Sequence, residues 1–269
     1  MSKADSKMNW FKIYKHKNGY VELVNKRNSP LKYINFGILN LNKGEVWKSN
    51  TKDNETVLIV LSGRMQVNVQ NKTFKIGMRK DVFSGKPEAV YIPREEKYTI
   101  KALSNCEVAV SSGMSDEKND LVIMKQKDVK QRVAGKYNWK RQIYDIVNNE
   151  IKADRLIIGE TYHMPGCWSC IPPHKHDTDR LPKESKLEEL YFFKIIPEEG
   201  FGFERVYSEG EKFDKVFVLK NNALLCMPFG YHSLAVSPGY RLYYLWILAG
   251  EKRVVKQYFD PRYEWLNKW

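Results

Sequence analysis

Short apolar runs separated by turn residues cover most of this chain. The runs are rich in β-branched and aromatic residues, which is typical of strands, and the three-and-four spacing of amphipathic helices is scarce. The clearest runs are LKYINFGILNL (31–41), TVLIVLSGRMQVNV (56–69), AVYIP (89–93), CEVAVSSG (106–113), RLIIGETYHM (155–164), ELYFFKII (189–196) and YRLYYLWILAG (240–250). This pattern predicts an all-β fold, a sandwich or barrel of antiparallel sheet with few short helices.

The two halves of the chain repeat one order of strand signals. In the first half, TVLIVLSG (56–63) closes on a glycine turn and AVYIP (89–93) ends in proline. In the second half, ELYFFKIIPEEG (189–200) and ALLCMP (223–228) do the same. The repeat predicts two related β-barrels in tandem.

A more polar segment separates the halves, and 269 residues are enough for two domains of about 100–150 residues each. We expect an N-terminal barrel over residues 1–120, a bridging segment over 121–150 and a C-terminal barrel over 151–269.

The positive charge of the chain raises the question of nucleic acid. Lys and Arg number 45 against 32 Asp and Glu, a formal net charge of +13. These basic residues are scattered, however, and form no arginine-rich run, zinc-finger spacing or RNP-type aromatic motif. We interpret them as a lysine-rich solvated surface that binds no nucleic acid but favours an acidic small molecule.

Membrane and secretion signals are missing from the sequence. No window approaches about 18 apolar residues, and the polar start MSKADSKMNWFK (1–12) lacks the apolar core of a signal peptide. We therefore expect a cytoplasmic protein without a membrane partner. The four cysteines, Cys106, Cys167, Cys170 and Cys226, are then expected to be reduced thiols.

Candidate metal ligands gather in the second half. His174 and His176 lie two apart in PPHKHD (172–177), so on an extended strand they face one side with Cα atoms roughly 7 Å apart. The preceding Pro172 and Pro173 favour such an extended approach over a helix. Two imidazoles in this arrangement can converge on one ion.

A carboxylate and a third histidine extend the set. Glu188 and Glu189 open a predicted strand and face opposite sides, so one of them can join the histidines. Glu189 shares its face with Tyr191 and other large residues of a barrel interior, where a carboxylate needs a partner. Glu188 is expected to point outward or to the rim. His232, in the turn after Pro228, completes three histidines and one glutamate.

This mixed nitrogen and oxygen set suits one divalent ion per chain. Zn²⁺ and Mn²⁺ are the first candidates, with Fe²⁺, Co²⁺ and Ni²⁺ as alternatives. Four protein ligands with open positions left on the ion indicate a catalytic rather than a structural metal.

A CxxC pair stands directly before the histidines and suggests a four-ligand cluster or a redox site. Cys167 and Cys170 are three apart, so on an extended strand they face opposite sides and cannot readily share one ion. We expect the CxxC to be incidental, and the HxH to be half of a site completed by Glu189 and His232.

The order HxH, Glu and PxGxH resembles the metal motifs of cupins, which are jelly-roll β-barrels. Two departures stand out: a long gap from His176 to Glu189, and one residue rather than two between Gly230 and His232. The resemblance implies tandem cupin domains, a bicupin. The first half keeps the outline of the motifs without their histidines, so its barrel is expected to bind no metal.

A narrower resemblance covers nearly the whole chain. It rests on WSCIPPHKHD (168–177), LEELYFF (187–193), GFGFERVY (200–207), PFGYH (228–232), YYLWILAG (243–250), DPRYEWL (260–266), IGMRKDVFSGKPEAVYIP (76–93) and GKYNWKR (135–141). These motifs resemble the 5-deoxy-glucuronate isomerases of bacterial myo-inositol catabolism and, more distantly, the 4-deoxy-threo-hexosulose-uronate ketol-isomerases of pectin breakdown. Both departures from the cupin pattern are features of that family. Within it, Cys167, Cys170 and Trp246 stand where Asn, Ser and Asn are usual, and the role of Trp246 stays open.

The resemblance implies an aldose–ketose isomerase that converts 5-deoxy-glucuronate to 5-dehydro-2-deoxy-gluconate. Arg205 is our first candidate for binding the substrate carboxylate, with Tyr207 on the same strand face. Tyr191 is a candidate for orienting the substrate. The sequence does not identify the base; the polar residues that border the ligands are Lys175, Asp177, Glu184 and Tyr231.

Two other functions fit parts of the pattern. A metal-dependent cupin dioxygenase would use the same ligands with Fe²⁺ and consume oxygen. A non-enzymatic sugar-binding regulator is a weaker alternative, because no DNA-reading helix pair is visible. Two barrels with exposed sheet faces, together with the resemblance, predict a homo-oligomer.

Overall fold

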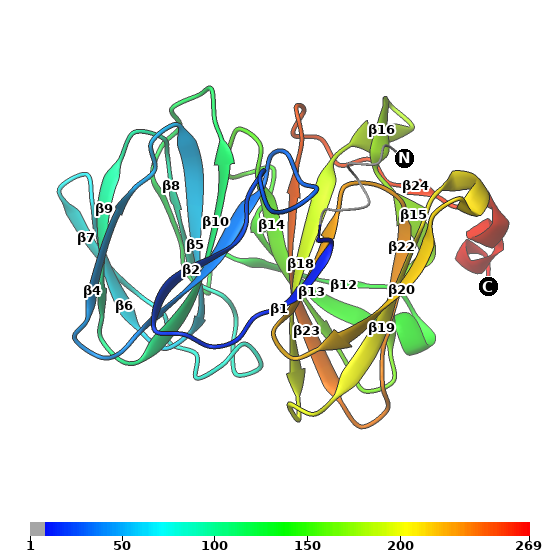
Figure 1. The fold of residues 1–269 in the computed structure, drawn as a ribbon, viewed down its shortest axis with the longest axis horizontal. Helices are drawn as coiled ribbons and strands as arrows, with labels where there is room; N and C mark the ends of the chain where they lie inside the picture. The colour runs from blue at the N-terminus through cyan, green and yellow to red at the C-terminus, as the bar shows by residue number, and fades with distance from the viewer. Residues whose placement is uncertain (1–8) are drawn as a thin grey trace.

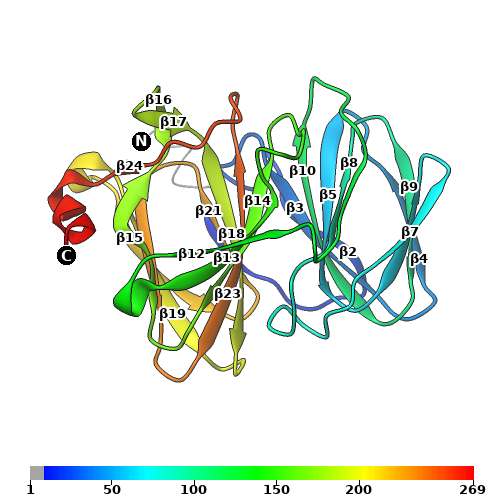
Figure 2. The same ribbon diagram turned by 180° about the vertical axis from the view of Figure 1, so that it is seen from behind.

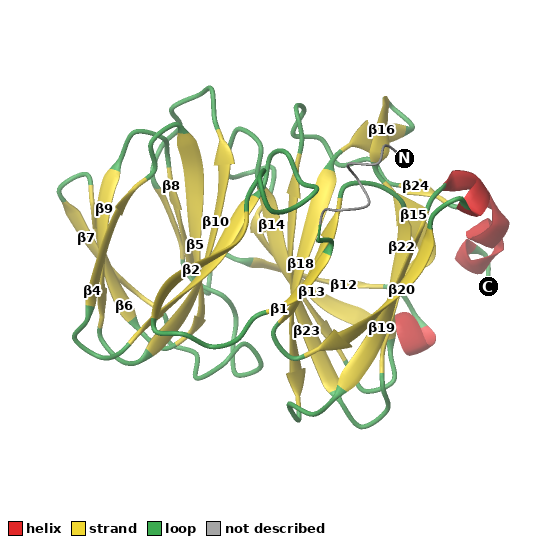
Figure 3. Cartoon of the chain, in the orientation of Figure 1, coloured by secondary structure: helices red, strands yellow, loops and turns green. Residues whose placement is uncertain are grey.

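The apolar runs form antiparallel strands that build two β-barrels side by side (Figures 1 and 2). The computed structural model describes residues 9–269. Figure 3 shows strands and loops along almost all of this length. The helices of this part are short 3-10 turns: η1 (Tyr137–Trp139), η2 (Glu209–Glu211) and η3 (Pro261–Asn267). None of the described helices is long and apolar enough to cross a membrane.

The N-terminal barrel consists of two sheets. The six-stranded sheet has the order β11 (Val122–Met124), β8 (Ala89–Ile92), β5 (Asn54–Ser62), β10 (Cys106–Met114), β3 (Asn35–Leu41) and β2 (Gly19–Val24). The four-stranded sheet has the order β4 (Val46–Asn50), β9 (Lys97–Ala102), β6 (Met65–Val69) and β7 (Lys72–Ile76).

The C-terminal barrel has a larger pair of sheets. The seven-stranded sheet has the order β1 (Phe11–Ile13), β21 (Ala223–Met227), β18 (Glu188–Ile196), β23 (Arg241–Ala249), β14 (Ile157–His163), β13 (Arg141–Val147) and β12 (Lys130–Ala134). The five-stranded sheet has the order β20 (Asp214–Lys220), β19 (Phe201–Tyr207), β22 (Tyr231–Val236), β15 (Trp168–Lys175) and β24 (Tyr258–Phe259). A small hairpin, β16 (Asp177–Arg180) and β17 (Glu184–Lys186), lies between β15 and β18 in the chain.

The two largest sheets pack against each other and bury both of their faces. One side of each sheet lines its own barrel, while the other side joins a single core that contains residues of both barrels, such as Phe36 and Phe192 with ring centroids 5.6 Å apart. Burial on both faces explains why β5 and β18 are continuous apolar runs instead of alternating ones.

The strands cross the expected domain boundaries in two places. Strand β1 lies near the start of the chain, yet it pairs with β21 in the C-terminal barrel, where Phe11 lies opposite Leu225. The bridging segment contributes β11 to the first barrel and β12 to the second. The division at residue 120 is therefore wrong for β1, because its edge is satisfied only by a strand of the second half.

Two buried glutamates tie each barrel to a loop of the other. Glu55 on β5 accepts hydrogen bonds of 2.8 Å from the backbone N–H groups of residues 154–156. Glu188 on β18 accepts bonds of 2.7–2.9 Å from the N–H groups of residues 32–34. Glu188 thus points out of its own barrel, as expected, but it is buried against the neighbouring one.

Candidate metal centre

The four predicted ligands meet inside the C-terminal barrel. His174 is near the end of β15 and pairs in register with His232 on β22, so both come from the five-stranded sheet. Glu189 comes from β18 in the opposite, seven-stranded sheet. His176 follows β15 directly, and all four side chains are buried. The site therefore lies between the two sheets of one barrel.

The ligand atoms form two overlapping groups of three. His176, Glu189 and His232 make one group, and Cys170, His174 and His232 make the other; within each group the ligand atoms lie within 4.8 Å of one another. His176 Nε2 lies 3.1 Å from Glu189 Oε2, and His232 Nε2 lies 3.3 Å from the same oxygen. His232 belongs to both groups and stands at the centre of the arrangement.

Backbone carbonyls fix how two of the imidazoles face the site. His176 Nδ1 lies 3.0 Å from the carbonyl oxygen of Leu187, and His232 Nδ1 lies 3.2 Å from that of Gly230. A carbonyl can only accept a hydrogen bond, so each Nδ1 carries a hydrogen and Nε2 is the nitrogen that is turned toward the site. Histidine ligands of metals are commonly oriented in this way.

The donor set fits a divalent metal ion. His232 is 1% exposed, and its Nε2 makes no hydrogen bond within residues 9–269. An orphaned buried nitrogen is costly unless a ligand satisfies it. Burial, and then the neighbouring His232 and His176, hold the pKa of His174 well below its ordinary value, so this imidazole is neutral, as a metal ligand must be.

A cavity of about 320 Å³ opens beside His174 and Glu189. Its wall includes Arg141 on β13, whose Nε is buried and has no hydrogen-bond partner among the described residues. Arg132 lines the same cavity but is already paired with Asp145 at 2.8 Å. Of the two arginines that line this pocket, Arg141 is therefore the one without an ion-pair partner among the described residues.

Aromatic side chains close the cavity. Tyr191 lines it and packs against Tyr244 with its ring tilted by 38° and the ring centroids 4.6 Å apart. Trp246 also lines it and donates a hydrogen bond of 3.1 Å from Nε1 to Thr161 Oγ1. Trp246 thus faces the pocket, and Tyr191 lies where a substrate-orienting group would stand.

The structure does not bring Arg205 to the cavity. Arg205 points to the outer face of β19, where it is paired with Asp214 at 2.6 Å, and it does not line the cavity. Tyr207 shares that outer face but is buried. Its hydroxyl donates a hydrogen bond of 2.7 Å to Asp260, the residue that precedes η3. On this strand Gly202, Glu204 and Val206 face the barrel interior.

Glu204 is a buried carboxyl that sequence reasoning missed. It is fully buried, and neither oxygen has a hydrogen-bond partner within the described part of the chain. Burial raises its pKa well above the ordinary value. In GFGFERVY the exposed phenylalanines alternate with Gly202, Glu204 and Val206, so the alternation itself was visible but its inward side was not.

The polar residues that border the ligands form a network outside the pocket. Lys175 Nζ lies 2.6 Å from Asp177 and 3.0 Å from Glu184. Asp177 also accepts a hydrogen bond of 2.9 Å from the backbone N–H of Gly230, in the turn that carries His232. Tyr231 stacks on Tyr207 at 5.3 Å. These four candidates hold the ligand-bearing loops together and do not line the cavity.

The two thiols of the CxxC have different surroundings. Cys167 is half-buried and lines a separate cavity with Met164. Cys170 is buried, and its Sγ is one of the ligand atoms grouped with His174 and His232. Cys170 therefore lies at the site and Cys167 does not, so the two thiols do not share one group of ligand atoms.

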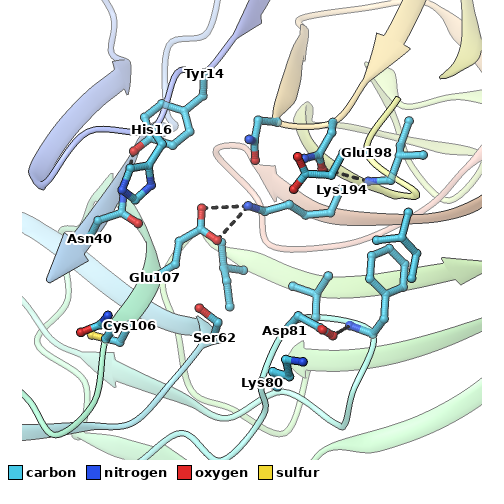
Figure 4. A pocket seen from close by; sticks show the side chains of 18 of the residues that line it. Tyr14, His16, Asn40, Ser62, Lys80, Asp81, Cys106, Glu107, Lys194 and Glu198 are labelled. Carbon is cyan, nitrogen blue, oxygen red and sulfur yellow. Dashed lines mark hydrogen bonds and ion pairs between the residues drawn. The ribbon is translucent and has the colours of Figure 1, made fainter. Parts of the chain in front are cut away.

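A larger cavity, of about 640 Å³, lies between the two barrels (Figure 4). Lys194 on β18 reaches Glu107 on β10 across it, with both carboxylate oxygens 2.8 Å from Nζ. Its one histidine is His16, so the predicted metal ligands lie elsewhere.

Fold and site together define a class: a bicupin with a candidate metal centre in its second barrel. The sequence profile of the KduI/IolB family matches residues 11–266. The chain belongs to this family.

Known proteins agree with that assignment. The 5-deoxy-glucuronate isomerase of Bacillus licheniformis is 35% identical over 249 residues, which cover 91% of this chain and 92% of the relative. An IolB-like protein from Salmonella typhimurium LT2 has a TM-score of 0.93 at 27% identity, covering 96% of this chain and 99% of that one. This chain is thus an enzyme of the isomerase class.

A more distant likeness concerns the fold alone. An oxalate decarboxylase of Bacillus subtilis, described for its Mn(II) centres, has a TM-score of 0.63 at 12% identity, covering 92% of this chain and 78% of that one. It shares the tandem barrels.

Proposed function

We propose that this enzyme converts 5-deoxy-glucuronate to 5-dehydro-2-deoxy-gluconate in myo-inositol catabolism, with one divalent metal ion held by His174, His176, Glu189 and His232. The observation that carries the proposal is the convergence of these four side chains beside a pocket that is lined by Arg141, an arginine without an ion pair among the described residues. Its substrate follows from the name of the curated relatives, which match over nine-tenths of the chain.

The reaction moves a hydrogen between adjacent carbons through an enediolate. A divalent ion held by these four residues would supply Lewis-acid chemistry at the substrate carbonyl. The Arg141 guanidinium binds the substrate carboxylate with its planar donors. Tyr191 and Trp246 line the walls, orient the sugar and keep bulk water out.

The first barrel is proposed to bind no metal. The strand register gives the equivalent positions, since Thr56 faces Ile92 as Glu189 faces Met227. Lys97 follows Ile92 by five residues in the first barrel, just as His232 follows Met227 by five residues in the second. A threonine and a lysine in place of the ligands predict a metal content of one ion per chain.

The test combines metal content with isomerase activity. His176→Ala should lose most of the bound metal and of the conversion of 5-deoxy-glucuronate followed by NMR, while His16→Ala, at an exposed position, should keep both. Full activity of the His176 variant would refute the site. The assay is run with and without oxygen, because oxygen consumption would favour the dioxygenase alternative.

We also propose that the chain works as a homo-oligomer in the cytoplasm. The outer face of β19 and β20 exposes Phe203, Val216 and Val218, an apolar patch of the kind that subunit contacts cover. Light scattering on the purified chain should give a mass above that of one copy. Phe203→Glu should reduce the mass if this patch forms the contact.

A further inference from the structure

Cys170 is turned into the metal centre by an irregularity of its strand. The register between β15 and β22 shifts between Ser169 and His174, and Cys170 has a φ of 56°, in the left-handed region that non-glycine residues rarely adopt. A bulge of this kind re-aims a side chain. Here it directs Sγ to the wall of the same cavity as His174 and Glu189.

The contacts of the thiol leave it available to a metal. Cys170 is 3% exposed, and its Sγ lies 3.7 Å from the Tyr191 hydroxyl and 3.8 Å from that of Ser169, both of them long contacts. Its ligand atom lies within 4.8 Å of those of His174 and His232. Separations within this limit allow the three atoms to contact one ion.

An unsatisfied nitrogen of His232 is independent evidence for a ligand at this site. His232 Nε2 is buried and has no hydrogen-bond partner within residues 9–269. Its neighbour Glu189 is 3.3 Å away but is shared with His176. The orphaned nitrogen stands between the two ligand groups and belongs to both.

We propose that Cys170 is a sulfur ligand of the metal centre, which makes the site selective for thiophilic divalent ions such as Zn²⁺ and Co²⁺ over Mn²⁺. This inference rests on the metal site of the proposed function and adds to it a donor that three histidines and a glutamate do not provide. When the ion binds, the thiol proton leaves to solvent and the thiolate donates to the metal. Thiolate ligands favour zinc, whereas carboxylate and water suit manganese.

Cobalt spectroscopy tests the sulfur ligand directly. The purified full-length chain is stripped with a chelator and loaded with Co²⁺. We expect a sulfur-to-cobalt charge-transfer band in the near ultraviolet, lost in Cys170→Ser and kept in the matched control Cys167→Ser. Co²⁺ that binds to the wild type without this band would overturn the inference and leave the proposed function standing. Failure of the wild type to bind Co²⁺ at all would overturn both.

Two further measurements cover the case in which the Cys170 variant does not fold. X-ray absorption of the Zn²⁺-loaded wild type should contain a zinc–sulfur path at about 2.3 Å; only nitrogen and oxygen neighbours would overturn the inference. Competition between metals gives the selectivity. Cys170→Ser should weaken Zn²⁺ binding by roughly tenfold or more and Mn²⁺ binding by much less. An unchanged ratio of the two affinities would overturn the claim of selectivity.

Discussion

Arg141 reaches the pocket through a pairing that is distant in the chain. It opens β13, and β13 lies beside β14, where Arg141 faces His163. Arg205, by contrast, is held on the outer face of its strand by Asp214. The two arginines therefore have different surroundings. Arg141 lines the cavity, and Arg205 forms an ion pair on the surface.

The two arginines give a matched pair of variants. Arg141→Gln should raise KM by about tenfold or more with a smaller effect on kcat, because it removes a charge-assisted contact worth roughly 1.5–3 kcal/mol. Arg205→Gln should leave both constants within about twofold, since exposed ion pairs contribute at most about 1 kcal/mol. Steady-state kinetics with 5-deoxy-glucuronate measure both constants. A larger rise in KM for Arg205→Gln than for Arg141→Gln would indicate that Arg205 binds the substrate carboxylate.

His163 makes stability depend on pH. Burial, with the Arg141 guanidinium next in importance, lowers the pKa of His163 to about 3 in the folded chain. In the unfolded chain the pKa is about 6.5, so acid protonates the unfolded state first. Its contribution to stability is complete above pH 6.5 and is lost as the pH falls toward 3.

This dependence is measurable by urea denaturation at pH 7 and pH 5. The wild type should lose about 2 kcal/mol more than His163→Gln over this interval, at most about 1.4 kcal/mol per pH unit below 6.5. His16→Gln, at an exposed position, serves as the control and should follow the wild type. Equal pH slopes for all three proteins would show that His163 does not contribute.

At the scale of the element, the alternation of residues along a strand predicted which side chains share a face, but not which face lines the barrel interior. On β18 this was enough, because Glu189, Tyr191 and Phe193 include large residues that line the barrel. On β19 the predicted site residues Arg205 and Tyr207 share the outer face with the exposed Phe201 and Phe203, and the inner set is Gly202, Glu204 and Val206. The inner face of β19 is set by its neighbours β20 and β22, which the local pattern does not report.

The glutamate on β5 that holds the other barrel's loop gives an element-scale prediction. Glu55→Ala leaves three backbone N–H groups and the Tyr91 hydroxyl without their acceptor. Each unsatisfied buried group costs about 1–3 kcal/mol, so the free energy of unfolding should fall by at least about 3 kcal/mol. Chemical denaturation measures it, with the exposed Glu198→Ala as the control, expected within about 0.5 kcal/mol of the wild type. A small loss for Glu55→Ala would mean that water replaces the carboxylate.

For the whole molecule, the sequence predicted the tandem barrels and the four converging ligands because both depend on patterns that repeat or recur along the chain. His174, Glu189 and His232 lie in strands that are bordered by proline and glycine turns, and His176 directly follows the strand of His174. Arg141 and Glu204 were missed because their approach to the site depends on strand order. Cys170 was set aside because an irregular strand, not a regular one, turns it inward.

Metal removal is a prediction at this largest scale. An ion present at about 100 times its Kd stabilises the folded chain by about 2.7 kcal/mol, so a chelator should lower the unfolding temperature. The two barrels share one core, so unfolding should stay a single transition with and without metal. Calorimetry checks both; two separate transitions would show that the barrels unfold independently.

The pairing of β1 with β21 has a consequence for folding during synthesis. Leu225, the partner of Phe11, is synthesised more than two hundred residues after it. The first barrel can assemble during translation, while β1 must wait as an unpaired edge. Completion of the C-terminal barrel therefore has to wait for β21, and a nascent chain released before that point would carry an open strand that recruits other chains.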